Sequence, residues 1–292
     1  MAKLIAEIGC NHKGSLELAK EMIGVAGRIC QVDAVKFQKR NNTELLSASQ
    51  YYAPHPVPSN AYGETYGAHR EALEFTPDQH AELMETCARE GVTYSTSVWD
   101  LTSAKEMAAL RPAFLKIPSA TNLHFDLQEW LCANYPGELH VSTGMTSAAE
   151  VESVVRFYEE RGRAKDVVLY VCTSGYPVPF EDLCLLEITR FKEMYGSRVR
   201  EIGFSGHHLG ISADIAAMAL GATVIERHFT LDRTWKGTDH AASLEPDGMR
   251  RLKRDLVNVN KALTYKRTEI LEIEEATRRK LKWEPASQVA AQ

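Results

Sequence analysis

Short apolar runs alternate with longer stretches of helical periodicity along most of the chain. The apolar runs are rich in Val, Ile, Leu and Phe, as buried strands are. They occupy Leu4–Gly9, Ala34–Gln38, Thr93–Val98, Phe114–Ile117, Leu139–Ser142, Val167–Cys172, Glu201–Ser205 and Val224–Phe229. The helical stretches occupy Leu16–Cys30, Asp78–Arg89, Ser103–Leu110, Phe125–Asn134, Ala148–Arg161, Asp182–Met194, Ile211–Leu220 and Pro246–Leu263. Eight strand–helix units over about 250 residues predict an α/β protein with a single (β/α)₈ TIM barrel.

Helix start signals support this pattern and set the expected domain limits. Ser15 precedes the first helical stretch, Thr76-Pro77 opens the second and Glu245-Pro246 opens the eighth. Such caps and first-turn prolines favour helix starts. The catalytic barrel is therefore expected over residues 1–263. Residues 264–292 are expected to form a C-terminal helical tail, helical as far as Trp283 and frayed beyond it, with no separate domain.

One connection is unusually long. The segment Arg40–Phe75 follows the second predicted strand and is rich in Tyr, Pro and Asn. Loops of this length inside a compact domain are usually functional or disordered. Because it follows a strand, it belongs to the catalytic face of a barrel. A flap over the substrate is favoured, with Asn60, Tyr62, Tyr66, His69 and Arg70 as its possible contacts with the substrate. A surface elaboration without a role is the alternative.

Composition excludes several classes of partner. With 44% hydrophobic and 25% charged residues, the chain has the composition of an ordinary globular protein. A formal charge of −5 provides no basic field for nucleic acid, and no lysine-rich tract or long apolar run suits a membrane. The opening MAKLIAEIGC does not have the pattern of a signal peptide. Six cysteines without CxxC spacing indicate free thiols, so a cytoplasmic protein is expected.

Polar residues gather at the carboxyl ends of the predicted strands, where the active sites of such barrels lie. In chain order they include Glu7, Lys36, Gln38, Thr96, Lys116, Ser119, Ser142, Ser174, Tyr176, Ser205, His207, Glu226 and His228. A lysine that ends a strand as apolar as FLKI is seldom there for packing. Lys36 and Lys116 among serines therefore predict a pocket for a doubly anionic ligand, such as one with a phosphate and a carboxylate. For any single Ser or Thr, a capping role is the alternative.

Two histidines end neighbouring strands. Strand side chains alternate between faces, so Glu226 and His228 point the same way while Arg227 points opposite. Ser205 and His207 share a face one strand earlier. A carboxylate beside an imidazole on a buried face requires pairing or a metal. We therefore predict that His207 and His228 bind a metal, with hydrogen-bonded structural histidines as the alternative. Imidazole ligands with open oxygen positions suit a divalent ion without selecting one.

Eight stretches in chain order resemble the sialic acid synthase family, the N-acetylneuraminate synthases and related makers of nine-carbon ulosonic acids. They are IAEIGCNHKGSLELAKEMI, DAVKFQ, EFTPDQHAELMETC, FLKIPSAT, STGMTS, CTSGYPVPFED, GFSGHHLGI and IERHFTLDRTWKGTDHAASLEP. The resemblance implies a barrel and a divalent metal, usually Mn²⁺, with Mg²⁺, Co²⁺ or Zn²⁺ as alternatives. It also implies condensation of phosphoenolpyruvate with the open-chain aldehyde of an aldose such as N-acetylmannosamine, with release of phosphate.

The resemblance also implies roles for individual residues. It places the metal on His207 and His228. Phosphoenolpyruvate would be bound by Lys36, Thr96, Lys116, Ser119, Ser142 and Ser205, with Ser174 beside them. Gln38, Tyr176 and Asp239 would contact the sugar, and Glu7, Glu226 and Asp239 would act as acid–base or orienting carboxylates.

Family members usually carry an additional antifreeze-like domain, which reaches across a dimer and gives an arginine to the neighbour's sugar site. The sequence ends in EEATRRKLKWEPASQVAAQ, so we expect the barrel without that domain. The flap would then cover the sugar site, and the five side chains named for the segment Arg40–Phe75 are possible partners of the sugar's hydroxyl and acetamido groups. The resemblance implies a homodimer that acts on small molecules. The alternatives are a synthase for a different or phosphorylated aldose, and a barrel that has lost turnover and serves as a binding subunit.

Overall fold

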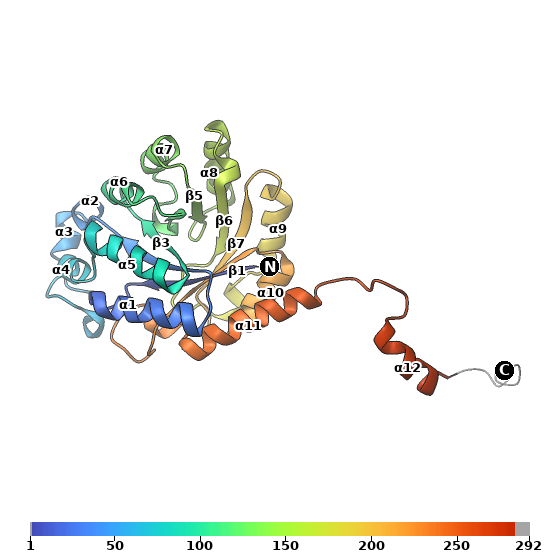
Figure 1. Cartoon of the computed structure of the whole chain (residues 1–292). Helices are drawn as coiled ribbons and strands as arrows, with labels where there is room; N and C mark the ends of the chain where they lie inside the picture. The colour runs from blue at the N-terminus through green and yellow to red at the C-terminus, as the bar shows by residue number, and fades with distance from the viewer. Residues whose placement is uncertain (1, 284–292) are drawn as a thin grey trace, which may run out of the picture. The chain divides into compact units, whose positions relative to one another are not determined.

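Eight parallel strands close into a barrel in which each strand is hydrogen-bonded to the next and β8 is hydrogen-bonded to β1. The computed structural model describes residues 2–283. Its contacts divide the chain into two units, residues 1–260 and residues 261 onward. The first unit is the predicted (β/α)₈ barrel, with its strands enclosed by helices (Figure 1).

Every predicted strand is present, with each end within one residue of the prediction. The strands are β1 (Lys3–Gly9), β2 (Ala34–Lys39), β3 (Thr93–Val98), β4 (Phe114–Ile117), β5 (Glu138–Ser142), β6 (Val167–Cys172), β7 (Glu201–Gly206) and β8 (Val224–His228). The agreement follows from their composition, because continuous apolar and β-branched runs suit strands that are covered on both faces.

The outer helices also follow the predicted order. They are α1 (Leu16–Gly24), α5 (Pro77–Glu90), α6 (Leu101–Ala109), α7 (Phe125–Asn134), α8 (Ala148–Glu160), α9 (Leu186–Tyr195), α10 (Ser212–Leu220) and α11 (Pro246–Ala262). The residues Val25–Ile29 continue α1 as a π-helical turn. Ser15 caps α1 by accepting a hydrogen bond from the Leu18 amide, and Thr76 forms a capping box with Gln79 at α5. Both predicted caps are confirmed.

One helix starts later than predicted. The sequence pattern starts a helix at Asp182, whereas α9 begins at Leu186. Cys184 has a φ of 48°, in the left-handed region, and a residue in that conformation cannot continue a right-handed helix. Residues Phe180–Asp182 form a separate 3₁₀ turn before this break.

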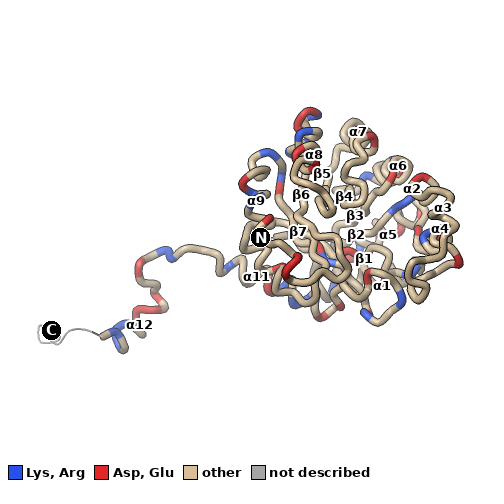
Figure 2. The backbone as a smooth tube through the Cα atoms, turned by 180° about the vertical axis from the view of Figure 1, so that it is seen from behind, with Lys and Arg blue, Asp and Glu red and all other residues tan. Residues whose placement is uncertain are grey.

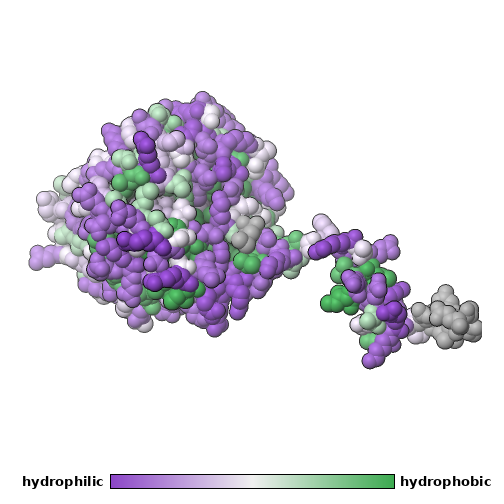
Figure 3. Space-filling view, viewed as in Figure 1, coloured by the Kyte–Doolittle hydropathy of each residue, from purple (hydrophilic) through white to green (hydrophobic). Residues whose placement is uncertain are grey.

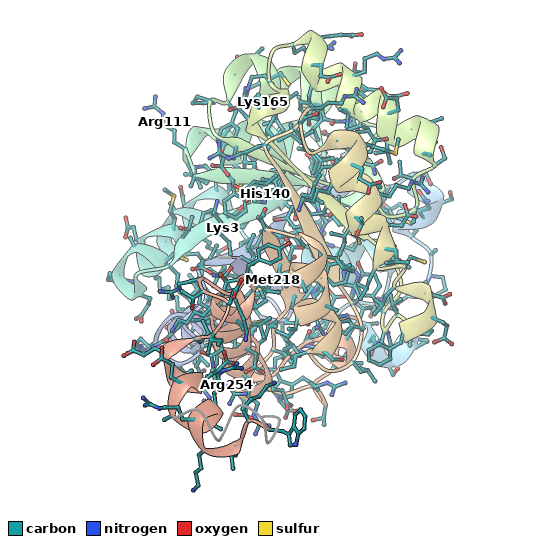
Figure 4. All side chains as sticks on the ribbon, turned by 90° about the vertical axis from the view of Figure 1, so that its right-hand side faces the viewer. Lys3, Arg111, His140, Lys165, Met218 and Arg254 are labelled. Atoms are coloured by element: carbon teal, nitrogen blue, oxygen red, sulfur yellow. The ribbon has the colours of Figure 1, made fainter. Side chains whose placement is uncertain are left out.

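Alternation along the strands builds the inside of the barrel in layers. On β1, Leu4, Ala6 and Ile8 belong to the outer core beneath the helices, whereas Ile5 belongs to a second apolar cluster. That inner cluster consists of Ile5, Ala34, Phe114, Val168, Tyr170 and Val224. It lies toward the end where the strands begin, which faces the viewer in Figure 4.

Two residues further along four of these strands, the same inward face carries charge. Ile5 is followed by Glu7, Ala34 by Lys36, Phe114 by Lys116 and Val224 by Glu226. Strand side chains return to the same face every second residue. The four charged side chains therefore form the next layer above the apolar residues of the inner cluster. The charged layer is thus a consequence of strand register.

The long connection Arg40–Phe75 is folded into short helices. These are α2 (Asn42–Leu45), α3 (Ala48–Tyr51), a 3₁₀ turn (Pro58–Asn60) and α4 (Tyr66–Glu71), and α2 to α4 lie together at one end of the barrel (Figure 1). The Tyr62 hydroxyl donates to the Lys236 carbonyl, and Lys236 Nζ lies 4.9 Å from the centre of the Tyr62 ring. The connection is therefore attached to the loop after β8, on the side of the barrel where the strands end.

Residues 261 onward contain α12 (Glu272–Leu281), and the segment between Ala262 and Glu272 is not helical.

Positive and negative residues are interspersed along the outer helices (Figure 2). The face of the barrel in Figure 3 is mostly hydrophilic, with small separate apolar patches. Among the described residues, no helix is both long and apolar enough to cross a membrane.

Candidate active site

A cavity of about 300 Å³ opens where the strands end, and most of the predicted site residues line it. Those residues are Glu7, Lys36, Gln38, Lys116, Ser119, Ser142, Ser174, Tyr176, Ser205, His207, Glu226 and His228. They come from six strands and from the loops that follow β4, β6 and β7. The barrel therefore gathers into one site residues that are spread over most of the sequence.

Two predicted residues lie outside this cavity. Thr96 is fully buried on the face of β3 that also carries Tyr94 and Val98, and both of these belong to the outer core. The hydroxyl that reaches the site from β3 belongs to Ser97, which accepts a 2.8 Å hydrogen bond from Lys36 Nζ. Asp239 lines an adjoining cavity, with its Oδ2 3.7 Å from His228 Nδ1.

Two lysines and two glutamates form a buried ionic cluster at the floor of the cavity. Lys36 Nζ lies 2.5 Å from Glu7 Oε2 and 3.9 Å from Glu226 Oε2. Lys116 Nζ lies 2.5 Å from Glu226 Oε1, which also accepts a 3.1 Å hydrogen bond from Ser205 Oγ. Strand register explains these pairs, because Glu7 is the β1 partner of Lys36 and Ser205 is the β7 partner of Glu226.

Burial and mutual attraction set the ionisation of the cluster. Burial raises the pKa of Glu7 to about 7, although Lys36 opposes the shift. Burial would also raise the pKa of Glu226, but Lys116 and Lys36 outweigh it and hold this pKa below its usual range. Burial lowers the pKa of Lys116 against the attraction of Glu226. Glu226 is thus an ionised carboxylate near both lysines, so the positive charge of the site is partly balanced.

Gly144 keeps two of the serines close to the cavity wall. Its amide donates a 3.0 Å hydrogen bond to Ser119 Oγ. A Cβ at this position would lie 2.8 Å from Ser119 Oγ and would collide with Ser174 Oγ. The absence of a side chain at residue 144 therefore allows both hydroxyls to stand beside the backbone.

We expect Gly144→Ala to raise the KM for an anionic substrate about tenfold, since overpacking costs about 1–3 kcal/mol and would displace both serines. Steady-state kinetics would measure this change. Gly248→Ala in α11 is the control, because its new Cβ meets only ordinary contacts, the nearest at 3.4 Å from Leu244. An unchanged KM in Gly144→Ala would show that these hydroxyls do not touch the substrate.

The two histidines lie side by side at the cavity. Their ring centres are 5.4 Å apart, and Tyr176 lies against both rings, 4.3 Å from His207 and 5.8 Å from His228. Burial lowers the pKa of each imidazole to about 3. Both rings are therefore neutral near pH 7, which is the form that binds metals.

These residues fit a divalent ion. Two imidazoles bound to one ion would have ring centres roughly 5 Å apart, given metal–nitrogen distances of about 2.0–2.1 Å. His207 Nδ1 is 3.0 Å from the Thr173 carbonyl, which places the ring proton there and leaves Nε2 as the ligand atom. His228 Nδ1 is buried without a hydrogen-bond partner. Over residues 2–283, no group of three or more His, Cys, Asp or Glu side chains is arranged to hold an ion, so among these residue types the site offers the two imidazoles.

A second cavity of about 360 Å³ adjoins the first and shares Gln38, Trp99, Tyr176 and His228 with it. Its remaining lining comes mainly from the connection between β2 and α5, including Arg40, His55, His69 and Arg70. His69 and Arg70 are among the residues of this connection that were predicted as possible sugar partners, and Tyr66, a third of them, also lines the cavity. Arg40 and His55 were not predicted, because a segment without strand or long-helix periodicity gives no sign of which side chains point inward.

Ser97 and Trp99 were also missed. Ser97 is two residues beyond Ser95 on β3, so alternation alone could have placed its hydroxyl on the inward face. Trp99 follows the end of β3, where alternation no longer applies, and its ring lines both cavities.

Comparisons with known proteins cover most of the barrel. The model of the NeuB family matches residues 22–268. Human N-acetylneuraminate-9-phosphate synthase is 35% identical over 278 residues, which cover 95% of this chain and 76% of the human protein. The N,N'-diacetyllegionaminic acid synthase of Campylobacter jejuni is 33% identical over 263 residues, covering 89% of this chain and 77% of that protein.

A solved structure agrees with these relatives. N-acetylneuraminic acid synthetase from Leptospira borgpetersenii, crystallised with citrate, matches with a TM-score of 0.80 at 27% sequence identity. The match covers 97% of this chain and 93% of the Leptospira chain. Sequence and structure comparisons therefore point to the same kind of synthase.

Proposed function

The chain belongs to the NeuB family of sialic acid synthases, and from this membership and the site geometry we propose that it condenses phosphoenolpyruvate with an aldose of the N-acetylmannosamine type. The products are a 3-deoxy ulosonic acid and phosphate. The observation that carries the proposal is one cavity lined by two buried lysines, several serine hydroxyls and two neutral histidines. Such a set suits an anionic three-carbon substrate held beside a polarised aldehyde.

In this reaction a carbon–carbon bond forms between C3 of phosphoenolpyruvate and the aldehyde carbon of the sugar. The aldehyde oxygen takes a proton and becomes a hydroxyl. Water adds at C2, the bond between C2 and the phosphate oxygen breaks, and a keto group remains at C2 while phosphate leaves. Atoms and charges balance with one water consumed.

The chain's own residues bind and orient the two reactants. Lys36 and Lys116 would attract the phosphate and carboxylate of phosphoenolpyruvate, and Ser119, Ser142 and Ser174 would donate hydrogen bonds. Holding both reactants in a reactive geometry can lower the barrier by up to roughly 7–11 kcal/mol.

The two carboxylates have different proposed tasks. Glu226 keeps Lys116 and Ser205 in place through contacts of 2.5 and 3.1 Å. Glu7 is next to His228 in the register of β1 and β8, so it is the carboxyl best placed to give a proton to the former aldehyde oxygen.

His207 and His228 would hold the divalent ion, for which we propose Mn²⁺. When bound there, such an ion would polarise the aldehyde as a Lewis acid and add positive charge to a site where carboxylates offset the lysines. Gln38, Tyr176 and Asp239 remain the proposed sugar contacts, because all three line the cavity that continues from His228.

The test is phosphate release from phosphoenolpyruvate with Mn²⁺ and a panel of aldoses. We expect release only when an aldose is present, with a product three carbons longer by mass spectrometry. If no aldose promotes release, the barrel is not a synthase of this kind and the binding-subunit alternative gains support.

Size-exclusion chromatography with light scattering would test the predicted homodimer, and fractionation would test the predicted cytoplasmic location.

A further inference from the structure

Tyr170 on β6 lies against the charged layer of the barrel. It is a fully buried member of the inner cluster, whereas Lys116 lines the cavity where the strands end. Lys116 Nζ lies over the Tyr170 ring, 4.3 Å from the ring centre. The negative charge of an aromatic face attracts a cation in this position. Lys116 therefore has two partners, the Tyr170 ring and the carboxylate of Glu226 at 2.5 Å.

Neighbouring strands fix the Tyr170 ring in this place. The Tyr170 hydroxyl is 2.7 Å from Nδ1 of His140 on β5. The His140 ring, labelled among the strands in Figure 4, stacks on Phe114 with the ring centres 4.1 Å apart. On the other side, Gly203 is the β7 partner of Tyr170, and a Cβ there would lie 2.7 Å from two carbons of the tyrosine ring. The hydrogen bond and the glycine together determine where the ring can lie.

Packing alone does not explain a tyrosine at this position. Ile5 and Val168 fill their parts of the inner cluster without a polar atom. A buried hydroxyl costs free energy unless it is hydrogen-bonded, and His140, which bonds it, is a second buried polar side chain. An aliphatic residue at position 170 would need neither group. The arrangement therefore indicates that the aromatic ring itself has a task.

The charge balance of the cavity floor shows what an aromatic ring can add. Glu7 and Glu226 already pair with Lys36 and Lys116 at 2.5 Å. A further carboxylate beside Lys116 would make the floor negative and would repel an anionic substrate. An aromatic face attracts an ammonium group without adding a net charge. Tyr170 can therefore hold Lys116 in place while the ammonium group still attracts an anion.

We propose that Tyr170 is a positioning residue for phosphoenolpyruvate binding, because the face of its ring holds the Lys116 ammonium group at the cavity. His140 and Gly203 contribute by fixing the ring. The inference rests on the proposed function, since it concerns the anionic substrate assigned to this cavity. Tyr170 is buried beneath Lys116 and acts only through it. Its loss should therefore raise the KM for phosphoenolpyruvate more than it lowers kcat.

The first test weakens the ring face while keeping the shape of the ring. Phenylalanine and its mono-, di- and trifluorinated analogues, incorporated at residue 170, differ chiefly in the negative charge of that face. In calorimetry, the dissociation constant of phosphoenolpyruvate should rise with each fluorine, by on the order of tenfold over the series. The same series at Phe191 is the control, since this buried ring on α9 packs against Tyr195 in the outer core. Equal affinity across the series at residue 170 would overturn the inference.

The second test uses ordinary substitutions and steady-state kinetics. Tyr170→Leu removes the ring and should raise the KM for phosphoenolpyruvate about tenfold, with the KM for the aldose unchanged. Tyr170→Phe keeps the ring and should retain a KM near that of the unmodified protein, although it loses the hydrogen bond to His140. Val168→Ala is the packing control, because it opens a gap in the same cluster without touching the ring's place. If Tyr170→Leu and Tyr170→Phe raised the KM equally, the hydroxyl and not the ring face would position Lys116.

The contact can also be measured without substrate. With ¹³C at the lysine ε-carbons, NMR should show the Lys116 methylene protons shifted upfield by the ring current of Tyr170. Lys116→Met identifies that resonance, and Tyr170→Leu should remove its shift. An ordinary chemical shift in the unmodified protein would overturn the inference even if phosphoenolpyruvate binds. A shifted resonance in a protein that binds no phosphoenolpyruvate would support the placement of Lys116 by the ring and contradict the proposed function instead.

Discussion

His228→Ala is expected to lower aldose-dependent phosphate release on the order of 10³-fold, since metal polarisation of a carbonyl contributes several kcal/mol. The variant should also bind Mn²⁺ far more weakly, because only His207 would remain of the pair whose ring centres are 5.4 Å apart. The fold should survive, since His228 Nδ1 has no hydrogen-bond partner to lose. Calorimetry with Mn²⁺ and circular dichroism would measure the two effects separately.

His124→Asn is the control for this variant. His124 is exposed and caps α7 by accepting a hydrogen bond from the Leu127 amide, a task that asparagine also performs. It should keep full activity and metal affinity. If His228→Ala retained the metal stoichiometry and turnover of the unmodified protein, the metal would have to be placed elsewhere.

The barrel could be predicted because its signals are local. The run Val167–Cys172 is apolar throughout, and Phe114–Ile117 is apolar except for Lys116, so their strand character does not depend on distant contacts. The inward face followed from alternation, which correctly separated Glu226 and His228 from Arg227. Arg227 points to the outer face of the sheet and pairs with Asp214 on α10, one of the helices that surround the strands.

The side chain of Thr96 was predicted on the wrong face of its strand. Its position came from a family pattern, and a shift of one residue along a strand moves a side chain to the opposite face. On β3 the inward residues are Ser95 and Ser97, so the hydroxyl beside Lys36 is that of Ser97. Tyr94 and Val98 are the large apolar residues of this strand and face the helices, so alternation from them places Thr96 outward and Ser97 inward.

The second cavity could be predicted only in part: His69 and Arg70 were expected among the sugar partners, but their arrangement was not. Arg70 and His69 come from a short helix in a long connection, and their neighbours Trp99 and His228 are distant in the sequence. Only the tertiary structure shows that Glu74 pairs with Arg40 and leaves Arg70 without a carboxylate. The pattern of polar residues in such a segment cannot distinguish a ligand contact from a solvated side chain.

Lys116→Met should weaken phosphoenolpyruvate binding by on the order of 100-fold and leave sugar binding little changed. Lys116 is 3% exposed, lies 4.3 Å from the centre of the Tyr170 ring and has Glu226 as its ion partner. Methionine fills a similar space without the charge that attracts the substrate's anionic groups. Calorimetry with phosphoenolpyruvate would measure the loss, and Lys165→Met, at an exposed lysine, is the control.

The same substitution should destabilise the fold by about 3–5 kcal/mol, because it leaves the buried carboxylate of Glu226 without its 2.5 Å partner. Replacing both partners, as Lys116→Met with Glu226→Gln, removes the uncompensated charge. The double variant should therefore recover much of the stability in urea denaturation but none of the phosphoenolpyruvate affinity. If affinity returned together with stability, Lys116 would act only through the fold. If neither variant changed affinity, the anion would bind outside this cavity.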